Sequence, residues 1–87
     1  MKKTSLITSN DVSLSEAVRD ALQAYWRTLE GDDPCNLYAL VLQEVERPLL
    51  ESVMAHCNGN LSRAAQCLGI HRSTLRKKLR EHALSIN

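Results

Sequence analysis

Apolar residues recur every three or four positions through most of the chain, which is the spacing of one face of an α-helix. The first such pattern begins after Ser13 and reaches Leu29, and Gly31 then offers a helix stop. A second pattern, with apolar residues on a wider face, begins within residues 34–37 and extends to Cys57. These two patterns predict two helices, the second of them long.

Both predicted helices carry recognisable end signals. Ser13 and Glu16 have the spacing of a capping box, in which the serine accepts a hydrogen bond from the helix backbone and the glutamate reaches back to the helix start. Residues 32–34, Asp-Asp-Pro, are expected to open the second helix, because a first turn tolerates proline and favours acidic groups. Pro48 lies in mid-helix, where the missing N–H is expected to bend the helix.

Residues 60–80 read NLSRAAQCLGIHRSTLRKKLR and predict two short helices joined by a glycine turn. The asparagine at the start suits a helix N-cap, and Gly69 stands where the first helix must end in a left-handed turn. Ile70 is expected to be buried directly after that turn. Ala65 is small enough to let the two helices cross closely, and the second helix carries Leu75 and Leu79, four apart, on its inward face, so that Leu75 returns it to the core. Together these features predict a helix-turn-helix.

The two parts of the chain carry opposite net charges. The overall charge is only +1, but residues 1–56 carry a net charge of −4 and residues 57–87 a net charge of +5. Positive charge gathered on a helix-turn-helix is expected of a surface that meets phosphate. The N-terminal residues of the second helix in such a unit meet base edges in the major groove, and Arg72 and Thr74 hold those positions. The next turn supplies cations suited to phosphates, Arg76, Lys77 and Lys78.

A chain of 87 residues buries only a marginal core by itself. The second predicted helix has apolar residues on flanking positions as well as on its main stripe, so its burial requires more than its own chain. No disulfide or metal framework is evident that would stabilise so small a domain in another way. We therefore expect a homo-oligomer. Its shared core is predicted to contain Val18, Leu22, Tyr25, Leu37, Leu40, Val41, Val45 and Leu49.

Three stretches resemble the Fis family (factor for inversion stimulation), small bacterial nucleoid-associated proteins that bend DNA. They read NLYALVLQEVERPLLESVM, GNLSRAAQCLGI and RSTLRKKL, and the resemblance covers residues 14–80. The last two stretches are also found, more loosely, in the DNA-binding ends of NtrC-type activators. The first stretch, together with the lack of an upstream ATPase domain, favours the stand-alone protein. An effector domain of the NtrC type is the alternative.

The resemblance implies an all-α homodimer in which the chain has three parts. Residues 1–12 would form a flexible arm, residues 13–57 two helices that interlock with their copies, and residues 58–87 the helix-turn-helix. Family dimers hold their recognition helices closer together than one turn of DNA, so the duplex must bend to meet both helices. Such binding is broad and weakly sequence-specific. The implied outputs are chromosome organisation and the activation or repression of promoters.

The resemblance also assigns roles within the DNA-binding surface. Arg72 matches the family's base-reading arginine, which can bond the O6 and N7 atoms of guanine. His71 stands at the N-cap of the recognition helix, where the family usually has an asparagine. An unperturbed histidine titrates near pH 6.5, so DNA binding is expected to strengthen in mild acid. Asn58 and Glu81 replace residues that are often basic in the family, so we expect weaker phosphate contacts at the edges of the DNA-binding surface. The other expected DNA contacts are Asn60, Ser62, Arg63, Thr74, Arg76, Lys77, Lys78 and Arg80.

The expected partners are double-stranded DNA and a second copy of the chain, with RNA polymerase and a site-specific recombinase as further candidates. In the family a β-hairpin arm touches the recombinase, and residues 1–12 look too short for a complete arm. The start of the chain shows no apolar signal-peptide region, and no stretch approaches the ~20 apolar residues of a membrane span. We therefore expect a cytoplasmic protein of the nucleoid.

Three cysteines and three histidines raise the alternative of a metal or redox protein. Zinc sites usually pair ligands two to four residues apart, whereas Cys57 and Cys67 are ten apart, and both are expected to be buried structural thiols. No glycine-rich phosphate loop or catalytic constellation is evident, so we expect no cofactor, no metal and no enzymatic activity. A basic surface that binds an acidic protein is the remaining alternative, which the salt dependence of binding would separate from DNA binding.

Overall fold

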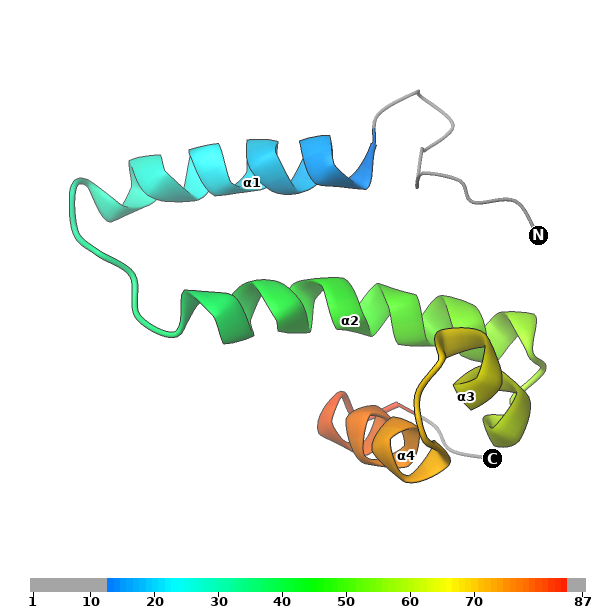
Figure 1. Ribbon diagram of the computed structural model, residues 1–87. Helices are drawn as coiled ribbons and strands as arrows, with labels where there is room; N and C mark the ends of the chain where they lie inside the picture. Colours follow the sequence, from blue (N-terminus) through cyan, green and yellow to red (C-terminus); the bar gives the residue numbers. More distant parts are fainter. Residues whose placement is uncertain (1–12, 85–87) are drawn as a thin grey trace. The chain divides into compact units, whose positions relative to one another are not determined.

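The computed structural model of the protein describes residues 13–84, which are mostly helical (Figure 1). Its helices are α1 (Leu14–Leu29), α2 (Leu37–His56), α3 (Leu61–Leu68) and α4 (Arg72–Glu81). This range contains no β-strand. The predicted all-α fold with four helices is therefore confirmed, while the predicted arm of residues 1–12 lies outside the described residues. The chain forms two compact units, with α1 in the first and the other three helices in the second.

α1 begins and ends close to the predicted positions. Ser13 is its N-cap, and the Oγ atom of Ser13 accepts a hydrogen bond from the backbone N–H of Glu16 at 3.2 Å. The Ser13 hydroxyl also lies 3.3 Å from the Glu16 carboxylate, so the two side chains meet directly. After Leu29 the chain reverses through Glu30 and Gly31, whose φ angles of 51° and 91° are left-handed. None of the 16 residues of α1 is buried, so its apolar stripe is covered only in part.

The second helix begins within the predicted range of residues 34–37, but the prediction that residues 32–34 open it is wrong. α2 begins at Leu37, and Asn36 precedes it in the left-handed conformation with a φ of 59°. A right-handed helix cannot continue backwards through such a residue, so the Asp-Asp-Pro segment stays outside the helix. Asparagine tolerates this conformation better than most residues. The backbone bond that marks the helix start joins the Leu40 N–H to the Asn36 carbonyl at 3.1 Å.

α2 runs as one continuous helix through Pro48 (Figure 1). The proline is thus accommodated inside the helix, and the bend expected there stays a prediction. Leu50, two residues further on, is the one residue of α2 that is buried. α2 therefore contributes a single fully covered side chain to the core of its own unit, although apolar residues extend along its whole length.

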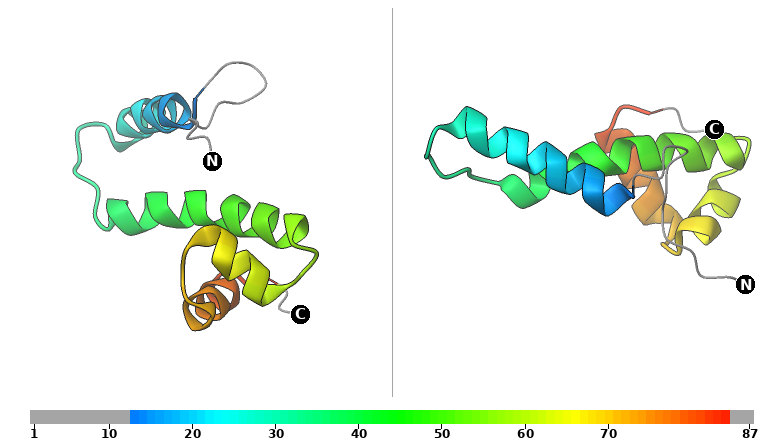
Figure 2. Two further views of the ribbon diagram at one scale, coloured as in Figure 1. Left: turned by 45° about the vertical axis from the view of Figure 1, so that its right-hand side comes forward. Right: turned by 90° about the horizontal axis from the view of Figure 1, so that it is seen from above.

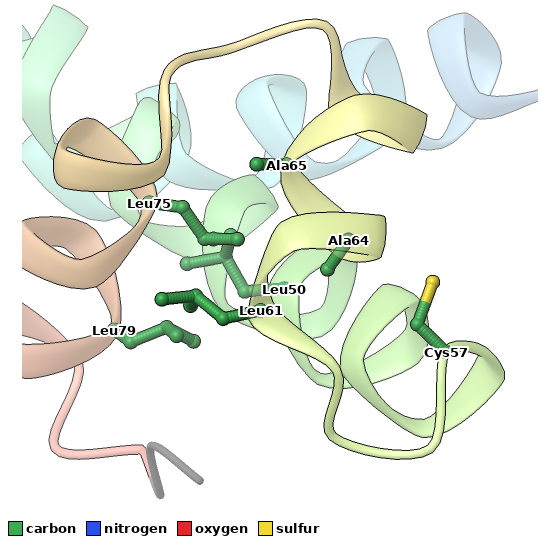
Figure 3. Close-up of a cluster of buried hydrophobic side chains, with 7 residues drawn as sticks. All are labelled: Leu50, Cys57, Leu61, Ala64, Ala65, Leu75 and Leu79. Carbon is green, nitrogen blue, oxygen red and sulfur yellow. The ribbon is translucent and has the colours of Figure 1, made fainter.

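The core of the second unit forms where α3 and α4 pack against the C-terminal half of α2 (Figures 1 and 2). Small residues of α3 and leucines of α4 surround Leu50 (Figure 3). Burying each leucine contributes roughly 1.5–3 kcal/mol. Leu75 and Leu79 are the inward face that the sequence predicts for α4. The buried core residues are Leu50, Cys57, Leu61, Ala64, Ala65, Leu75 and Leu79.

Gly69 forms the predicted turn between α3 and α4. Its φ is 74°, and both its own N–H and that of Ile70 donate to the Ala65 carbonyl, at 2.9 and 3.1 Å. A Cβ atom at Gly69 would meet no atom within 4 Å, so glycine is required by the backbone conformation and not by a lack of space. Ile70 packs against the core but is only half-buried, because it follows the turn at the rim of the core. The prediction of a buried residue at this position is therefore correct only in part.

Candidate nucleic-acid interface

The N-terminus of α4 is exposed and is capped by His71. Its Nδ1 atom accepts a hydrogen bond from the backbone N–H of Ser73 at 3.1 Å and lies 2.8 Å from the Ser73 hydroxyl. Such a cap requires Nδ1 to be free of a proton, so the neutral ring carries its proton on Nε2. The expected place of His71 at the N-cap is confirmed.

Arg72, the first residue of α4, has a side chain that is held by the preceding helix. Its Nη1 atom donates a hydrogen bond to the Oγ atom of Ser62 on α3 at 3.2 Å. Both residues are exposed, so the bond joins the outer surfaces of the two helices and restricts the rotamers of a long side chain. The remaining donors of the guanidinium fork stay available, and such a fork matches the O6 and N7 atoms of guanine.

The start of α3 lies beside this pair of side chains. Asn60 is the N-cap of α3, as predicted, and its Oδ1 atom accepts from the backbone N–H of Arg63 at 3.1 Å. The amide NH₂ group of Asn60 is therefore the part of this side chain suited to a phosphate oxygen. Ser62, Gln66 and Arg72 are among the residues that line a shallow hollow between α3 and the start of α4. No sequence pattern singles out Gln66, because polar residues are common on the outer face of any helix.

The inner face of α4 is apolar and its outer faces are polar and basic. Arg72, Arg76 and Arg80 recur at intervals of four, so they form one row along the helix. Thr74 and Lys77 occupy a neighbouring row, three residues apart. All five residues are exposed. The fold therefore presents these predicted contacts on the surface of one helix.

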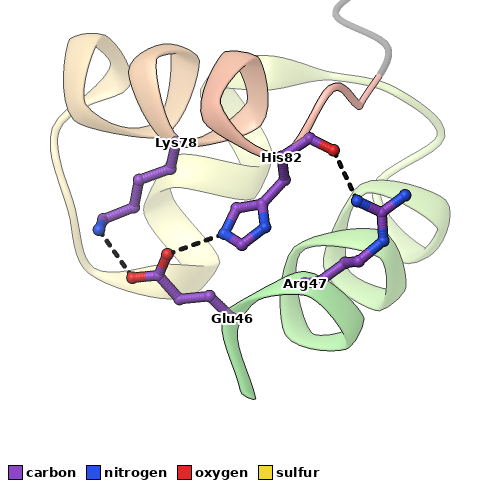
Figure 4. Close-up of polar contacts among 4 residues, drawn as sticks. All are labelled: Glu46, Arg47, Lys78 and His82. Atoms are coloured by element: carbon purple, nitrogen blue, oxygen red, sulfur yellow. Dashed lines mark hydrogen bonds and ion pairs between the residues drawn. The ribbon is translucent and has the colours of Figure 1, made fainter. Parts of the chain in front are cut away.

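Lys78 differs from the other predicted phosphate contacts, because its ammonium group is paired within the fold (Figure 4). Its Nζ atom donates to the Oε2 atom of Glu46 on α2 at 2.7 Å, and the two side chains are 32% and 19% exposed. The hydrogen bond from Lys78, together with that from His82, lowers the pKa of the Glu46 carboxyl. The same contact raises the pKa of Lys78. Both groups are therefore charged at neutral pH.

Two further residues complete this contact, which we call the α2–α4 clasp (Glu46, Arg47, Lys78 and His82; Figure 4). The Nε2 atom of His82 lies 3.1 Å from the Oε1 atom of Glu46, and Nη1 of Arg47 donates to the His82 backbone carbonyl at 2.6 Å. This carbonyl lies just past α4, where helix carbonyls lack an intrahelical partner. The partners are 32 to 36 residues apart in sequence, so no local pattern could have revealed the clasp.

The prediction of two buried structural cysteines is correct for Cys57 and wrong for Cys67. Cys57 belongs to the core, whereas Cys67 is exposed on α3. The inward stripe of α3 passes through positions 61, 64, 65 and 68, and position 67 falls beside it.

Within residues 13–84 no three His, Cys, Asp or Glu side chains form a group that could hold a metal ion. Over the same range no helix has both the length and the apolar character needed to cross a bilayer.

Comparisons with known proteins agree with this arrangement. The sequence pattern of a family of bacterial regulatory proteins, the Fis family, matches residues 41–82, which contain most of α2 and the whole helix-turn-helix. The chain is 52% identical over 71 residues to a Fis-like DNA-binding protein of Ralstonia nicotianae, covering 82% of this chain and 92% of that protein. It is also 51% identical over 74 residues to the DNA-binding protein Fis of Glaesserella parasuis, covering 85% of this chain and 76% of that protein.

Proposed function

Since the chain belongs to the Fis family of bacterial regulatory proteins, we propose that it is a homodimer that binds and bends double-stranded DNA. In this proposal it organises the nucleoid and regulates transcription in the cytoplasm, and it has no enzymatic activity. RNA polymerase and a site-specific recombinase are further candidate partners. Residues 13–57 are proposed to form the dimer, and residues 58–87 to bind DNA.

One observation carries the DNA-binding part of the proposal, namely the exposed position of Arg72 and its contact with Ser62. The N-terminus of the second helix is the part of a helix-turn-helix that meets base edges. An arginine that bonds guanine is the commonest specific contact in the major groove. A side chain already oriented by its neighbour loses less rotamer entropy when it makes that contact.

The exposed polar and basic groups around Arg72 are proposed to contact the DNA backbone. Each phosphate that they neutralise releases condensed counterions, so affinity should fall steeply as salt rises. The proposed DNA contacts are Asn60, Ser62, Arg63, His71, Arg72, Thr74, Arg76, Lys77 and Arg80. We revise the role expected of Lys78, because its ammonium group is paired with Glu46. Lys78 is proposed to hold α4 against α2 and to support DNA binding through the orientation of that helix.

Apolar residues that a single chain leaves uncovered support the dimer. No residue of α1 is buried, and Leu50 is the one buried residue of α2. Tyr38 is 79% exposed, and Leu40 and Leu49 are 42% and 48% exposed. Covering such surface contributes roughly 25 cal/mol for each Å² removed from water, which favours association. The proposed shared core is the predicted one, Val18, Leu22, Tyr25, Leu37, Leu40, Val41, Val45 and Leu49.

A dimer carries two copies of α4, and each is proposed to enter a major groove on the same side of the duplex. When the two helices are closer together than one turn of DNA, the duplex has to bend to meet both. Bending costs less at flexible base steps and at narrow minor grooves, so the sequence preference arises partly without base contacts. This mechanism gives broad, weakly specific binding of the kind that a nucleoid protein requires.

The proposal is tested by a gel shift on A/T-centred and random duplexes across a salt series. The wild type is expected to give complexes whose reduced gel mobility indicates bent DNA. The logarithm of its affinity should fall linearly with the logarithm of the salt concentration. Arg72→Ala should bind roughly 5- to 150-fold more weakly, the loss that corresponds to about 1–3 kcal/mol for one base-reading arginine. Failure of the wild type to shift any duplex at low salt would contradict the proposal.

The matched control for that experiment is Arg27→Ala, which removes the same charge from an exposed position in the last turn of α1. It should leave the affinity for DNA unchanged within about twofold.

Light scattering after size exclusion tests the dimer separately, and a monomeric mass at micromolar concentration would contradict the proposed dimer. Shifts confined to a few specific paired sites would favour the alternative, an effector domain of the NtrC type.

A further inference from the structure

Two of the three cysteines meet at the corner between α2 and α3. The Sγ atoms of Cys57 and Cys67 are 3.8 Å apart, although the residues are ten positions apart in the sequence. Cys57 is the C-cap residue directly after α2, and it is 1% exposed, at the edge of the core (Figure 3). Cys67 lies on α3 and is exposed. The fold thus places one shielded thiol directly behind one accessible thiol.

The two thiols have different surroundings. Burial raises the pKa of the Cys57 thiol, and the contact with Cys67 raises it further, while the nearby Arg63 guanidinium opposes this in part. Cys57 therefore remains protonated at neutral pH and is closed to oxidants in solution. Cys67 is the thiol that such molecules can reach. This asymmetry gives the accessible sulfur the role of first nucleophile and the shielded sulfur the role of resolving thiol.

We propose that Cys57 and Cys67 form a redox-active dithiol that low-molecular-weight disulfides, such as oxidised glutathione, convert into a cross-link between the end of α2 and α3. The Cys67 thiolate attacks one sulfur of the oxidant, which breaks the S–S bond and releases one thiolate. Cys57 then loses its proton and attacks the Cys67 sulfur, which forms the new disulfide and releases the second thiolate. Two protein thiols are oxidised and one small disulfide is reduced, so electrons and atoms balance.

Closure of the disulfide requires a short movement of the two sulfurs, from 3.8 Å apart to about 2.05 Å. The Cys57 N–H donates to the Val53 carbonyl at 3.0 Å, and its carbonyl accepts from the Asn60 N–H at 3.0 Å, so the backbone of Cys57 is held and its side chain has to supply the movement. The segment between the two cysteines carries Asn60, Ser62 and Arg63, which lie on the proposed DNA-binding surface. The cross-link would therefore fix the segment that leads into the helix-turn-helix.

The test uses the full chain with Cys35→Ser, which removes the exposed third cysteine and its intermolecular disulfides. This variant is incubated with millimolar oxidised glutathione, and thiols are counted before and after. Trypsin cuts after Arg63, between the two cysteines, so their peptides stay joined only when the disulfide is present. We expect the loss of two thiols, joined peptides, and a chain that still runs as a monomer on non-reducing denaturing gels.

Closing a loop of about ten residues should also raise the melting temperature of the oxidised protein by roughly 10–20 °C over the reduced protein. Adding Cys67→Ser, at an exposed position, should abolish the joined peptides and the temperature shift. Adding Cys57→Ala should trap glutathione on Cys67. A stable glutathione adduct on Cys67 while Cys57 is present, or a cross-link between chains, would overturn the proposal. None of these measurements involves DNA, so they are independent of the proposed function.

Discussion

Lys78 on α4 and Glu46 on α2 form an ion pair with 2.7 Å between Nζ and Oε2. The pair lies on the side of α4 that faces α2, next to the buried His82, whose backbone carbonyl is held by Arg47. Lys78, a cation of the basic helix α4, thus attaches that helix to α2. The orientation of the proposed recognition helix depends on this contact as well as on its two buried leucines.

The first prediction concerns the stability of the clasp. Glu46→Gln removes the charge but keeps the size of the side chain, and it should lower the free energy of unfolding at pH 7 by about 1 kcal/mol, since both partners are partly exposed. Chemical unfolding followed by circular dichroism measures the loss, at one fixed protein concentration because association contributes to stability. Glu44→Gln, at an exposed position on the same helix, is the control and should change little.

The same variant gives a pH dependence whose sign follows from the pKa shifts. The pKa of Glu46 is lowered in the folded protein, so its contribution is present above the ordinary glutamate pKa and is lost as pH falls through the lower folded value. The pKa of Lys78 is raised, so its contribution is kept up to the ordinary lysine range. The difference between wild type and Glu46→Gln should be present above the ordinary glutamate range and should shrink in acid. An equal difference at about pH 3, below the ordinary glutamate range, would show that packing, and not charge, is responsible.

Adjacent lysines provide the second prediction. Lys77 is exposed, whereas the ammonium group of Lys78 is paired with Glu46. Lys77→Ala should weaken binding to all duplexes and reduce the slope of log affinity against log salt by about 0.9 for each phosphate that the variant no longer neutralises. Lys78→Ala should leave that slope nearly unchanged and lower the melting temperature instead. Gel shifts over a salt series, paired with thermal unfolding, compare the two, and identical slopes would contradict the assignment.

The helices and their caps could be predicted from the sequence because their signals are local. The apolar stripe of each helix, the cap at Asn60 and the left-handed Gly69 all depend on residues within four positions of one another. The same kind of local signal wrongly places residues 32–34 at the opening of α2. Proline and acidic residues are a recognised start signal, but Asn36 adopts the left-handed conformation and excludes a continuous helix before it.

Contacts between distant residues could not be predicted. Helical spacing places Lys78 beside the inward face of α4 and Lys77 on the opposite side, but the partner of Lys78, Glu46 on another helix, could not be predicted. The contact between Cys57 and Cys67 likewise depends on how the corner between α2 and α3 is folded. The row of arginines on α4 was predictable, because helical spacing alone places those residues together, whereas the bond from Arg72 to Ser62 depends on the crossing of two helices.

The third prediction concerns the turn that sets this crossing. Gly69→Ala should lower the free energy of unfolding by about 1–2 kcal/mol, because alanine is strained at a φ of 74° even though the space is open. Gly69→Asn should lose less, since asparagine tolerates the left-handed conformation. Unfolding curves of the three proteins give the order. If asparagine were the more damaging of the two, side-chain size and not backbone strain would control this position.

The fourth prediction separates two roles for Ser62. Its hydroxyl accepts from Nη1 of Arg72 at 3.2 Å, and the residue also lies on the surface proposed to contact phosphate. If its main role is to orient Arg72, Ser62→Ala should weaken binding about threefold to tenfold on duplexes with the preferred guanine and much less on random ones, because a net hydrogen bond is worth about 1 kcal/mol.

A double-mutant cycle with Arg72→Ala distinguishes the roles, since two residues that act through one contact are not additive. In the Arg72→Ala background, Ser62→Ala should weaken binding less than about twofold, because there is no guanidinium to orient. An undiminished effect in that background would show that the serine contacts the DNA backbone by itself. The cycle is measured at one salt concentration, because a change of salt would move all four affinities together.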